Sequence, residues 1–292
     1  MRLDTPDGNL HPSRRTIAAS LFMSGYATAA VSSCASPVMT SSAELITGDA
    51  HVIGAGGYQL PAFIARPRDR AQHGAIIVVN EIFGIHDYIK DVCRRFAQEG
   101  YVALAPDYFD RAGDPAPLTD MAVIREIVAS ASLEQVMGDT EGALAWLARQ
   151  RFINARAMGI TGFCWGGTAV WMAAARFSQI KAGVAWYGRL VAPQAGGFAS
   201  EEPRQWPVDV AATLRTPVLG LYAENDRGIP LESVENMRAA LRTSGNSSRS
   251  EIIVYPGVGH GFHADYRESY NAEAAANGWA RCLNWFRDHG VA

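Results

Sequence analysis

The sequence predicts a single α/β domain built on a mostly parallel central sheet with helices on its faces. Apolar runs of strand length alternate along the chain with segments of helical periodicity, which is typical of βαβ units with right-handed crossovers. No Gly-, Pro- or Ser-rich linker divides the chain, and no internal repeat is present. The 292 residues, 48% hydrophobic and 19% charged, suffice for one large core and exclude a mainly disordered or collagen-like chain.

Strands are expected where apolar residues run without interruption between turn residues. Residues 74–79 (Gly-Ala-Ile-Ile-Val-Val) are the clearest example, because a strand buried on both faces needs no polar alternation. The run at 101–105 ends at Pro106, which cannot donate to a strand ladder. The expected strands are 57–65, 74–79, 101–105, 157–161, 182–187, 218–222 and 251–255.

Helices are expected where apolar residues recur every three or four positions. In 87–99, Ile89, Val92 and Phe96 fall on one face, and Gly100 follows at the usual position after a helix end. The long stretch 188–217, with four prolines and three glycines, fits neither pattern, and such loops often cover a site. The expected helices are 87–99, 118–130, 134–149, 168–176, 232–243 and 270–289.

Residues 1–43 differ from the rest and are predicted to be a twin-arginine signal peptide with a flexible leader, ahead of a domain at 44–292. The pair Arg14-Arg15 precedes a short apolar run, and Ala27-Thr28-Ala29 is a small-x-small cleavage site. A periplasmic or exported protein is therefore expected. The alternative is a cytoplasmic protein with a disordered extension or a mis-set start codon. The run is too short for a membrane span, and Cys34 follows a loose lipobox.

Composition and motif spacing indicate which classes of binding partner this protein lacks. The net charge of −3 lacks the basic excess of a nucleic-acid binder, and Gly54-Ala-Gly-Gly57 lacks the spacing of a dinucleotide site. No CxxC pair or zinc-ligand spacing is present, so neither a metal site nor a cofactor is predicted. A monomer acting on a small molecule is expected. The four cysteines are widely scattered, at positions 34, 93, 164 and 282.

One cysteine lies in a sequence context that predicts chemistry. Residues 162–167 (Gly-Phe-Cys-Trp-Gly-Gly) stand between an expected strand and an expected helix, which is the G-x-nucleophile-x-G turn with cysteine in place of serine. The sulfur of Cys164 would lie at a helix N-terminus, where partial positive charge favours the thiolate. The backbone N–H of Trp165 would face a developing oxyanion. The alternative is a buried structural cysteine in a glycine turn.

A thiol nucleophile needs a base, and the base needs an acid that orients it. In this kind of fold the chain order is nucleophile, acid, histidine. Asp226 follows the strand expected at 218–222, and His260 follows the one at 251–255, so both lie where open α/β sheets bind ligands. Glu224 is the rival acid, and His263, which reads as a helix-start or surface residue, is the rival base.

A second motif, Asn-Glu-Ile-Phe-Gly at 80–84, follows the strand at 74–79. The oxyanion hole of such a fold takes its second N–H from this loop, and Ile82 is the expected donor. Glu81 would then lie close to the thiol, where a carboxylate opposes the thiolate and can accept the S–H hydrogen bond. The alternative for Glu81 is a solvated loop acid.

Taken together, these motifs resemble the dienelactone hydrolase family (carboxymethylenebutenolidase-like) of α/β-hydrolases, from about residue 50 to the C-terminus. The resemblance implies the α/β-hydrolase fold, with Cys164 as nucleophile, His260 as base and Asp226 as its orienter. It implies that Glu81 holds the resting thiol protonated until substrate displaces it. It also implies cofactor-independent opening of an enol-lactone through a thioester. The matching segments are 80–84, 105–107, 162–167, 187–188, 226 and 259–262.

The substrate is less well defined than the chemistry. Well-known members of that family hold a substrate carboxylate with an arginine four residues after the histidine, and here that position is Ala264. A general carboxylesterase or thioester hydrolase, and a non-catalytic binding protein of the same fold, are the alternative functions. Three arginines could replace the missing one: Arg111, Arg227 and Arg267. The tentative aromatic pocket walls are Tyr108, Trp165, Trp206 and Phe262.

Overall fold

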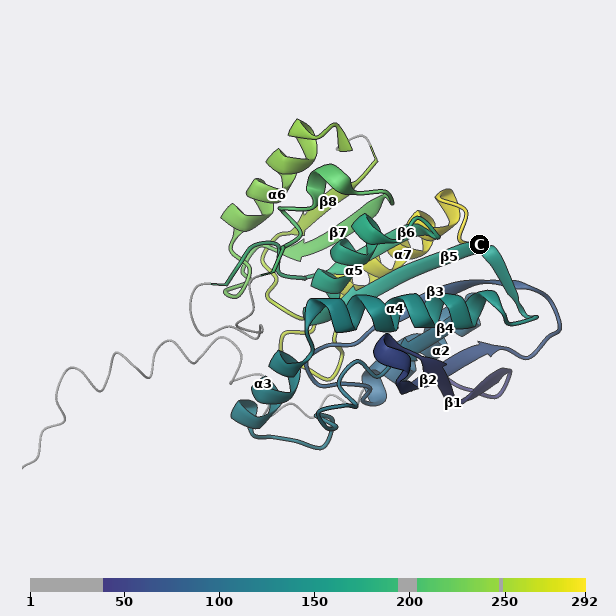
Figure 1. The fold of residues 1–292 in the computed structure, drawn as a ribbon. Helices are drawn as coiled ribbons and strands as arrows, with labels where there is room; N and C mark the ends of the chain where they lie inside the picture. Colours follow the sequence, from purple (N-terminus) through teal and green to yellow (C-terminus); the bar gives the residue numbers. More distant parts are fainter. Residues whose placement is uncertain (1–38, 194–203, 247–248) are drawn as a thin grey trace, which may run out of the picture.

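The structure is a computed structural model that describes residues 39–193, 204–246 and 249–292. Its centre is an eight-stranded sheet in the order β1-β2-β4-β3-β5-β6-β7-β8 (Figure 1). All neighbouring strands from β4 to β8 are parallel, and β2 runs antiparallel to the strands on both of its sides. The strands are β1 (Leu45–Ile53), β2 (Gln59–Pro67), β3 (His73–Val79), β4 (Val102–Pro106), β5 (Ile153–Phe163), β6 (Ile180–Trp186), β7 (Val218–Ala223) and β8 (Glu251–Tyr255).

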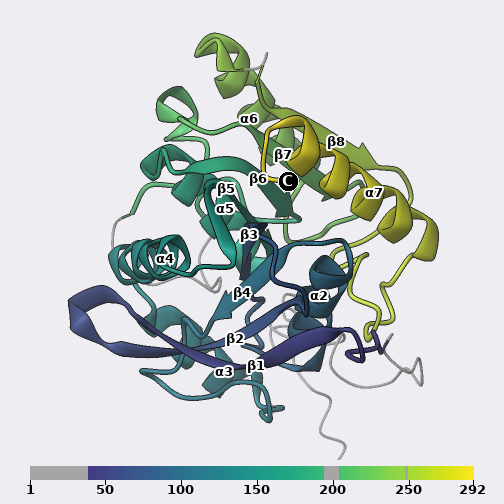
Figure 2. The same ribbon diagram turned by 90° about the vertical axis from the view of Figure 1, so that its right-hand side faces the viewer.

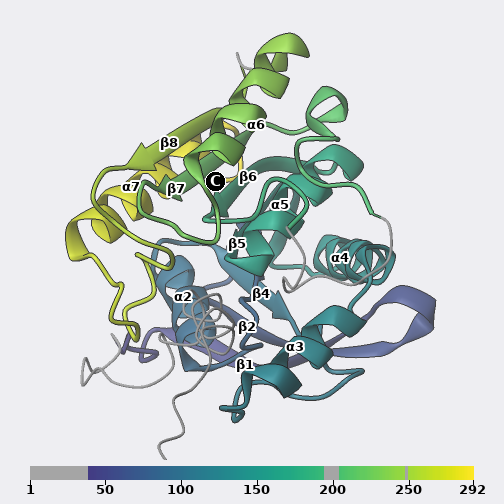
Figure 3. The same ribbon diagram turned by 90° about the vertical axis from the view of Figure 1, so that its left-hand side faces the viewer.

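Helices cover both faces of the sheet. α2 and α7 pack on one face, and α4 and α5 pack on the other, as the two side views show (Figures 2 and 3). The mostly parallel α/β architecture and the single domain predicted from the sequence are confirmed. The helices are α2 (Asp87–Gln98), α3 (Met121–Ser130), α4 (Leu133–Ala148), α5 (Trp165–Arg176), α6 (Leu231–Thr243) and α7 (Ala272–Asp288), with 3-10 turns η2 (Ala55–Gly57) and η3 (Ala211–Thr213).

The sequence prediction missed strand β1. This edge strand buries Leu45, Ala50 and Val52, and exposes most of the residues between them. Thr47, Gly48 and Asp49 interrupt its apolar residues, so the segment shows no continuous apolar run, and pairing with β2 over nine residues supplies the order. Helix α5 begins at Trp165, directly after Cys164, rather than at the expected residue 168.

The two ends of the described chain pack against the domain. Thr40 bonds to α2, although the sequence analysis assigned residues 39–43 to a flexible leader. Val291 is fully buried, and a Cβ added to Gly74 at the start of β3 would lie 1.6 Å from its carbonyl oxygen. Arg14, Arg15, the cleavage site and Cys34 lie outside the described residues. No helix in the described ranges is long and apolar enough to cross a membrane.

Candidate active site

Cys164 lies at a sharp turn between the carboxyl end of β5 and the first residue of α5. Its backbone has φ 54° and ψ −115°, a region that L-residues rarely adopt. Two hydrogen bonds hold the turn: the Cys164 N–H donates to the Trp186 carbonyl, and the Gly167 N–H donates to the Cys164 carbonyl. Cys164 is only 6% exposed, and it stands directly before the first residue of α5. The turn therefore holds a nearly buried thiol at the N-terminus of this helix.

The glycines of this turn are required by packing. A Cβ on Gly162 would lie 2.4 Å from the Gly166 carbonyl oxygen, and one on Gly166 would lie 2.5 Å from the Val79 carbonyl oxygen. A Cβ on Gly167 would lie 2.6 Å from the Trp186 carbonyl oxygen. These neighbours are backbone atoms of the turn and of adjacent strands, so the turn can approach the sheet only without side chains.

Asp226 and His260 meet at the ends of the neighbouring strands β7 and β8. The Oδ1 atom of Asp226 accepts hydrogen bonds from the N–H groups of Gly228 (2.8 Å) and Ile229 (3.0 Å). The Oδ2 atom therefore remains for His260, whose Nδ1 lies 2.6 Å away and donates to it. This contact orients the imidazole and leaves Nε2 as the other ring nitrogen, the one that could exchange a proton with a nucleophile.

The imidazole of His260 also interacts with Cys164. Burial alone would lower the pKa of His260, but the charges of Asp226 and Cys164, with a hydrogen bond to each, raise it well above its ordinary value. The structure thus brings together the three residues that the sequence analysis had placed 62 and 34 positions apart. Such an arrangement can carry a proton between sulfur and imidazole while a carboxylate stabilises the imidazolium.

The two expected oxyanion donors lie beside the thiol. Ile82, Cys164 and Trp165 line one pocket together with His260. Trp165 is the first residue of α5, and the first four N–H groups of a helix have no partner inside it. Ile82 follows Glu81 in a tight turn in which the Gly84 N–H donates to the Glu81 carbonyl. Both residues are therefore at the carboxyl edge of the sheet and line the same pocket as Cys164.

Glu81 is completely buried rather than solvated. Its carboxylate accepts a hydrogen bond from the Tyr266 hydroxyl (2.6 Å) and pairs with Arg267 (3.2 Å), while His86 Nε2 lies 3.6 Å away. Burial would raise the pKa of Glu81, but Arg267, His86 and Tyr266 outweigh it and lower the pKa to about 2. Burial likewise opposes the charge of Arg267, yet Glu81, Tyr266 and Cys164 raise its pKa. Arg267 therefore pairs with Glu81, and the negative charge on Cys164 also favours its charged form.

The tentative substrate contacts have different positions. Trp206 lines the pocket, with 8% of its surface exposed. Tyr108 is buried and bonds Thr140, and Phe262 packs among core aromatic rings. Arg111 forms two hydrogen bonds with Asp139, at 2.8 and 2.9 Å. Of the seven tentative contacts, Trp165 and Trp206 line the described pocket and Arg227 does not. Tyr108, Phe262, Arg111 and Arg267 contact structural partners instead.

The sequence analysis missed two cationic residues, Arg189 and Arg204, in the pocket lining. The Arg204 guanidinium stacks over the Trp206 ring at 4.1 Å, and its buried Nε has no hydrogen-bond partner among the described residues. Burial lowers the pKa of Arg204 from its ordinary value. Both residues belong to the irregular stretch 188–217, where no periodic pattern could have placed them. The remaining lining residues are Thr168, Tyr187 and Ile229.

The two rival residues have structural positions. Glu224 is exposed and accepts a hydrogen bond from the Gly257 N–H. His263 is buried, not at the surface as expected, and its Nδ1 lies 2.6 Å from the Tyr88 hydroxyl. Burial, followed by the charge of Arg95, lowers the pKa of His263 to about 3. His263 is therefore a neutral core histidine packed between Phe163 and Trp279.

Comparison with known proteins identifies the family. The model of the dienelactone hydrolase family matches residues 60–290, which include every residue of the site described above. The chain belongs to the dienelactone hydrolase family. It is accordingly a hydrolase of the carboxylic-ester class, similar to carboxymethylenebutenolidase, and acts on small molecules.

Relatives and solved structures agree with this assignment. A "Putative carboxymethylenebutenolidase" of Methylorubrum extorquens is 44% identical over 282 residues, covering 96% of this chain and 94% of the relative. An Escherichia coli protein of the same name is 44% identical over 269 residues, covering 91% and 96%. The crystal structure of a "Putative Dienelactone Hydrolase" from Klebsiella pneumoniae has a TM-score of 0.77 and 43% identity, covering 83% of this chain and 98% of that one.

Proposed function

We propose that this dienelactone hydrolase family member opens a lactone or related ester through a Cys164–His260–Asp226 triad and a thioester intermediate. The observation that carries the proposal is the position of His260, whose Nδ1 is fixed by Asp226 while its interaction with Cys164 raises its pKa. A raised imidazole pKa beside a thiol at a helix N-terminus favours the imidazolium–thiolate pair.

In the first half of the reaction, the Cys164 thiolate attacks the ester carbonyl carbon and forms a C–S bond. The carbonyl oxygen takes the negative charge and faces the N–H groups of Ile82 and Trp165, each worth ~3–4 kcal/mol in comparable enzymes. The ester C–O bond then breaks. In an enol-lactone the leaving oxygen becomes an enolate, which is a good leaving group. The imidazolium of His260 gives its proton to this enolate, which yields the ketone and neutral His260.

In the second half, His260 acts as a base toward water. Neutral His260 removes a proton from the water, whose oxygen attacks the thioester carbon. The C–S bond breaks, and the sulfur leaves as thiolate, which takes up the imidazolium proton or pairs with it. The carboxylic acid product ionises and is released, so the cycle consumes one water and no cofactor.

Glu81 is proposed to regulate the thiol. If the Glu81 carboxylate lay next to the sulfur, it would accept the S–H hydrogen bond and keep the thiol protonated. If it pairs with Arg267 instead, the thiol is free to give its proton to His260. The second arrangement matches the contacts of Glu81 described above. Substrate binding would then exchange the carboxylate of Glu81 between Cys164 and Arg267, whose charged form both groups favour.

The pocket favours a substrate that carries an anionic group. Arg189 and Arg204 line it together with Cys164, and no ion pair involves either arginine within the described residues. A guanidinium stacked on Trp206 is held ready to bind a carboxylate through two hydrogen bonds. An anionic lactone is therefore expected to be preferred over a neutral ester of the same size.

The leader is proposed to direct export by the twin-arginine route, so that the mature enzyme would act in the periplasm. The paired arginines, the short apolar run and the small-x-small site support this proposal, with a cytoplasmic enzyme as the alternative.

The test is the turnover of a panel of neutral and carboxylate-bearing lactones, p-nitrophenyl esters and amides. Cys164→Ala should abolish hydrolysis, and an acyl group transferred from the ester should be detected on Cys164 of the wild-type chain by mass spectrometry. Arg204→Ala should raise KM for carboxylate-bearing substrates about tenfold and leave neutral ones nearly unchanged. Full hydrolysis by the Cys164→Ala variant would disprove the assignment of the nucleophile.

A further inference from the structure

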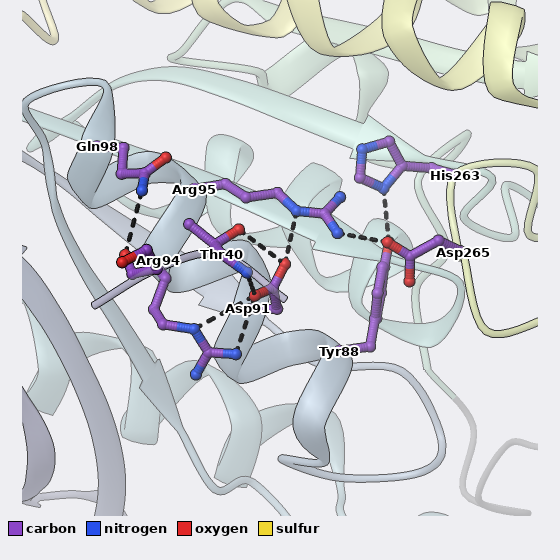
Figure 4. A network of polar contacts seen from close by, with 9 residues as sticks. Thr40, Tyr88, Asp91, Arg94, Arg95, Gln98, His263 and Asp265 are labelled. Atoms are coloured by element: carbon purple, nitrogen blue, oxygen red, sulfur yellow. Dashed lines mark hydrogen bonds and ion pairs between the residues drawn. The ribbon is translucent and has the colours of Figure 1, made fainter. Parts of the chain in front are cut away.

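A buried polar network connects the N-terminal segment of the domain to the loop that carries His260. We call it the strap network and define it as Thr40, Asp91, Arg95 and Asp265 (Figure 4). Thr40 comes from the segment before β1, and Asp91 and Arg95 come from α2. Asp265 comes from the 256–271 loop between β8 and α7. Three segments that are distant in the sequence are thus joined by charged groups.

Asp91 is the centre of the network and is almost completely buried, at 2% exposed. Its Oδ1 accepts the Thr40 backbone N–H at 2.7 Å, and its Oδ2 accepts the Thr40 hydroxyl at 3.1 Å. Arg94 donates to Oδ1 at 2.9 Å, and Arg95 Nε donates to Oδ2 at 2.8 Å. Each oxygen of the carboxylate thus accepts hydrogen bonds from Thr40 and from one arginine, which fixes the orientation of the carboxylate and of both arginines.

Arg95 connects this centre to the loop. While its Nε bonds Asp91, its Nη2 bonds Asp265, which is 4% exposed. The planar guanidinium spans two carboxylates at once, a geometry that a lysine ammonium on a flexible stem cannot reproduce. Arg94, which also pairs with Asp91, adds a second positive charge beside the two aspartates and Arg95, so this buried cluster has no net charge.

The loop held in this way carries both groups that act on the thiol. His260 lies five residues before Asp265, and Tyr266 and Arg267, which bind Glu81, follow it directly. A shift of Asp265 would therefore displace the imidazole and the partners of Glu81 together. Small displacements of positioned groups cost catalysis heavily, up to about a hundredfold for 1 Å.

We propose that Arg95 and Asp265 are positioning residues for the reaction, and that the Thr40 segment completes their alignment by fixing Asp91. The proposal rests on the function proposed above. Neither residue belongs to the pocket lining, so their effect is argued to pass through the 256–271 loop. The segment at Thr40, which the sequence analysis assigned to the leader, thereby contributes to catalysis.

Arg95→Lys is the decisive variant because it keeps the positive charge and loses the bridge. Arg94→Lys is the matched control, since Arg94 lies on the same helix and bonds Asp91 but has no bond to the loop. We expect Arg95→Lys to lower kcat about tenfold on the best ester of the panel, with KM within about twofold. Arg94→Lys should change both constants less than twofold. Iodoacetamide should modify Cys164 at a changed rate only in Arg95→Lys.

A second pair of variants tests the contribution of Thr40 to the strap network. It also keeps the proposal testable if Arg95→Lys folds poorly. Thr40→Pro removes both donors to Asp91, and Thr40→Ser retains both. Thr40→Pro should lower kcat about threefold, and Thr40→Ser should match wild type. The melting temperature of each variant is measured in parallel, and every assay is run well below it. A loss of kcat under these conditions then reflects mispositioning and not unfolding.

The outcomes are distinct. If Cys164→Ala is inactive while Arg95→Lys and Thr40→Pro have the kcat of their controls, positioning is wrong and the proposed function stands. If Cys164→Ala is fully active, the proposed function and this inference both fail. If Arg95→Lys and Arg94→Lys lose melting temperature alike with kcat unchanged, the network is only structural.

Discussion

At the scale of single residues, the site depends on Asp226, whose two carboxylate oxygens have different partners. Asp226 uses one oxygen to close its own turn with Gly228 and Ile229, and offers the other to His260. The turn explains why an aspartate in this loop is oriented before any substrate binds. The chain order and the strand ends made the pairing with His260 predictable. The contacts of Glu81 were not predictable, because Tyr266 and Arg267 lie about 185 positions away.

Asp226→Asn should lower kcat by about 10³-fold or more while KM changes little. An amide can orient the imidazole in the wrong tautomer and cannot stabilise the imidazolium, an effect known from the serine triad. Steady-state kinetics on the best ester measure the change. Glu224→Gln is the control, since Glu224 is exposed and bonds only the Gly257 N–H, and it should remain within about twofold of wild type. Equal losses in both variants would contradict the role of Asp226.

Asp107→Asn should stabilise the protein at neutral pH. Burial, with the charges of Asp110 and Asp114, raises the pKa of Asp107 to about 6, although the Phe109 N–H bond lowers it. A carboxyl with a raised folded-state pKa favours folding most below pH 4, and its contribution is lost as pH rises toward 6. The variant should gain about 1–2 kcal/mol at pH 7.5 and little at pH 4, measured by urea unfolding. A larger gain at pH 4 would reverse the sign and refute the argument.

At the scale of elements, one deviation from the prediction is the start of α5, in addition to the missed strand β1. The pattern of apolar residues favoured a start at 168, because Gly166 and Gly167 are poor helix formers. The structure begins the helix at Trp165, and both glycines are needed where the first turn contacts β3 and β6. A local propensity is thus overridden by a packing requirement that involves two distant strands, which explains why spacing alone could not find it.

Gly166→Ala should destabilise the protein by about 3 kcal/mol or more, because the new Cβ would lie 2.5 Å from the Val79 carbonyl oxygen and 2.6 Å from that of Asn80. Gly48→Ala in β1 is the control, since its Cβ meets nothing within 4 Å. It should be neutral or slightly stabilising because alanine loses less backbone entropy. Chemical unfolding measures both, and similar stabilities of the two variants would show that the turn can relax.

At the scale of the whole molecule, the alternation of strands and helices was sufficient to predict one α/β domain. It was not sufficient for β1, whose order comes from pairing at the sheet edge rather than from its own composition. The same limit applies to the pocket. The residues on strand ends could be placed from the sequence, but Arg189 and Arg204 could not, because they belong to a stretch without periodicity.

Replacing Arg14 and Arg15 by lysine should retain the protein in the cytoplasm. The twin-arginine route recognises the paired guanidinium groups, whereas a general secretion signal tolerates any positive charge. Cell fractionation with an antibody to the domain, in a host that exports the wild-type chain, measures the distribution. Arg68→Lys, a substitution within the domain, is the control and should leave export unchanged. Equal export of the double-lysine variant and wild type would exclude the twin-arginine route.

The burial of Val291 against Gly74 has a consequence for how the protein is made. The last turns of the chain complete the packing of β3, a central strand that emerges early from the ribosome. The nascent chain must therefore hold this strand without these neighbours until residue 291 has left the ribosome. Slow synthesis of the segment between residues 74 and 291 would extend the time during which the strand is exposed to aggregation.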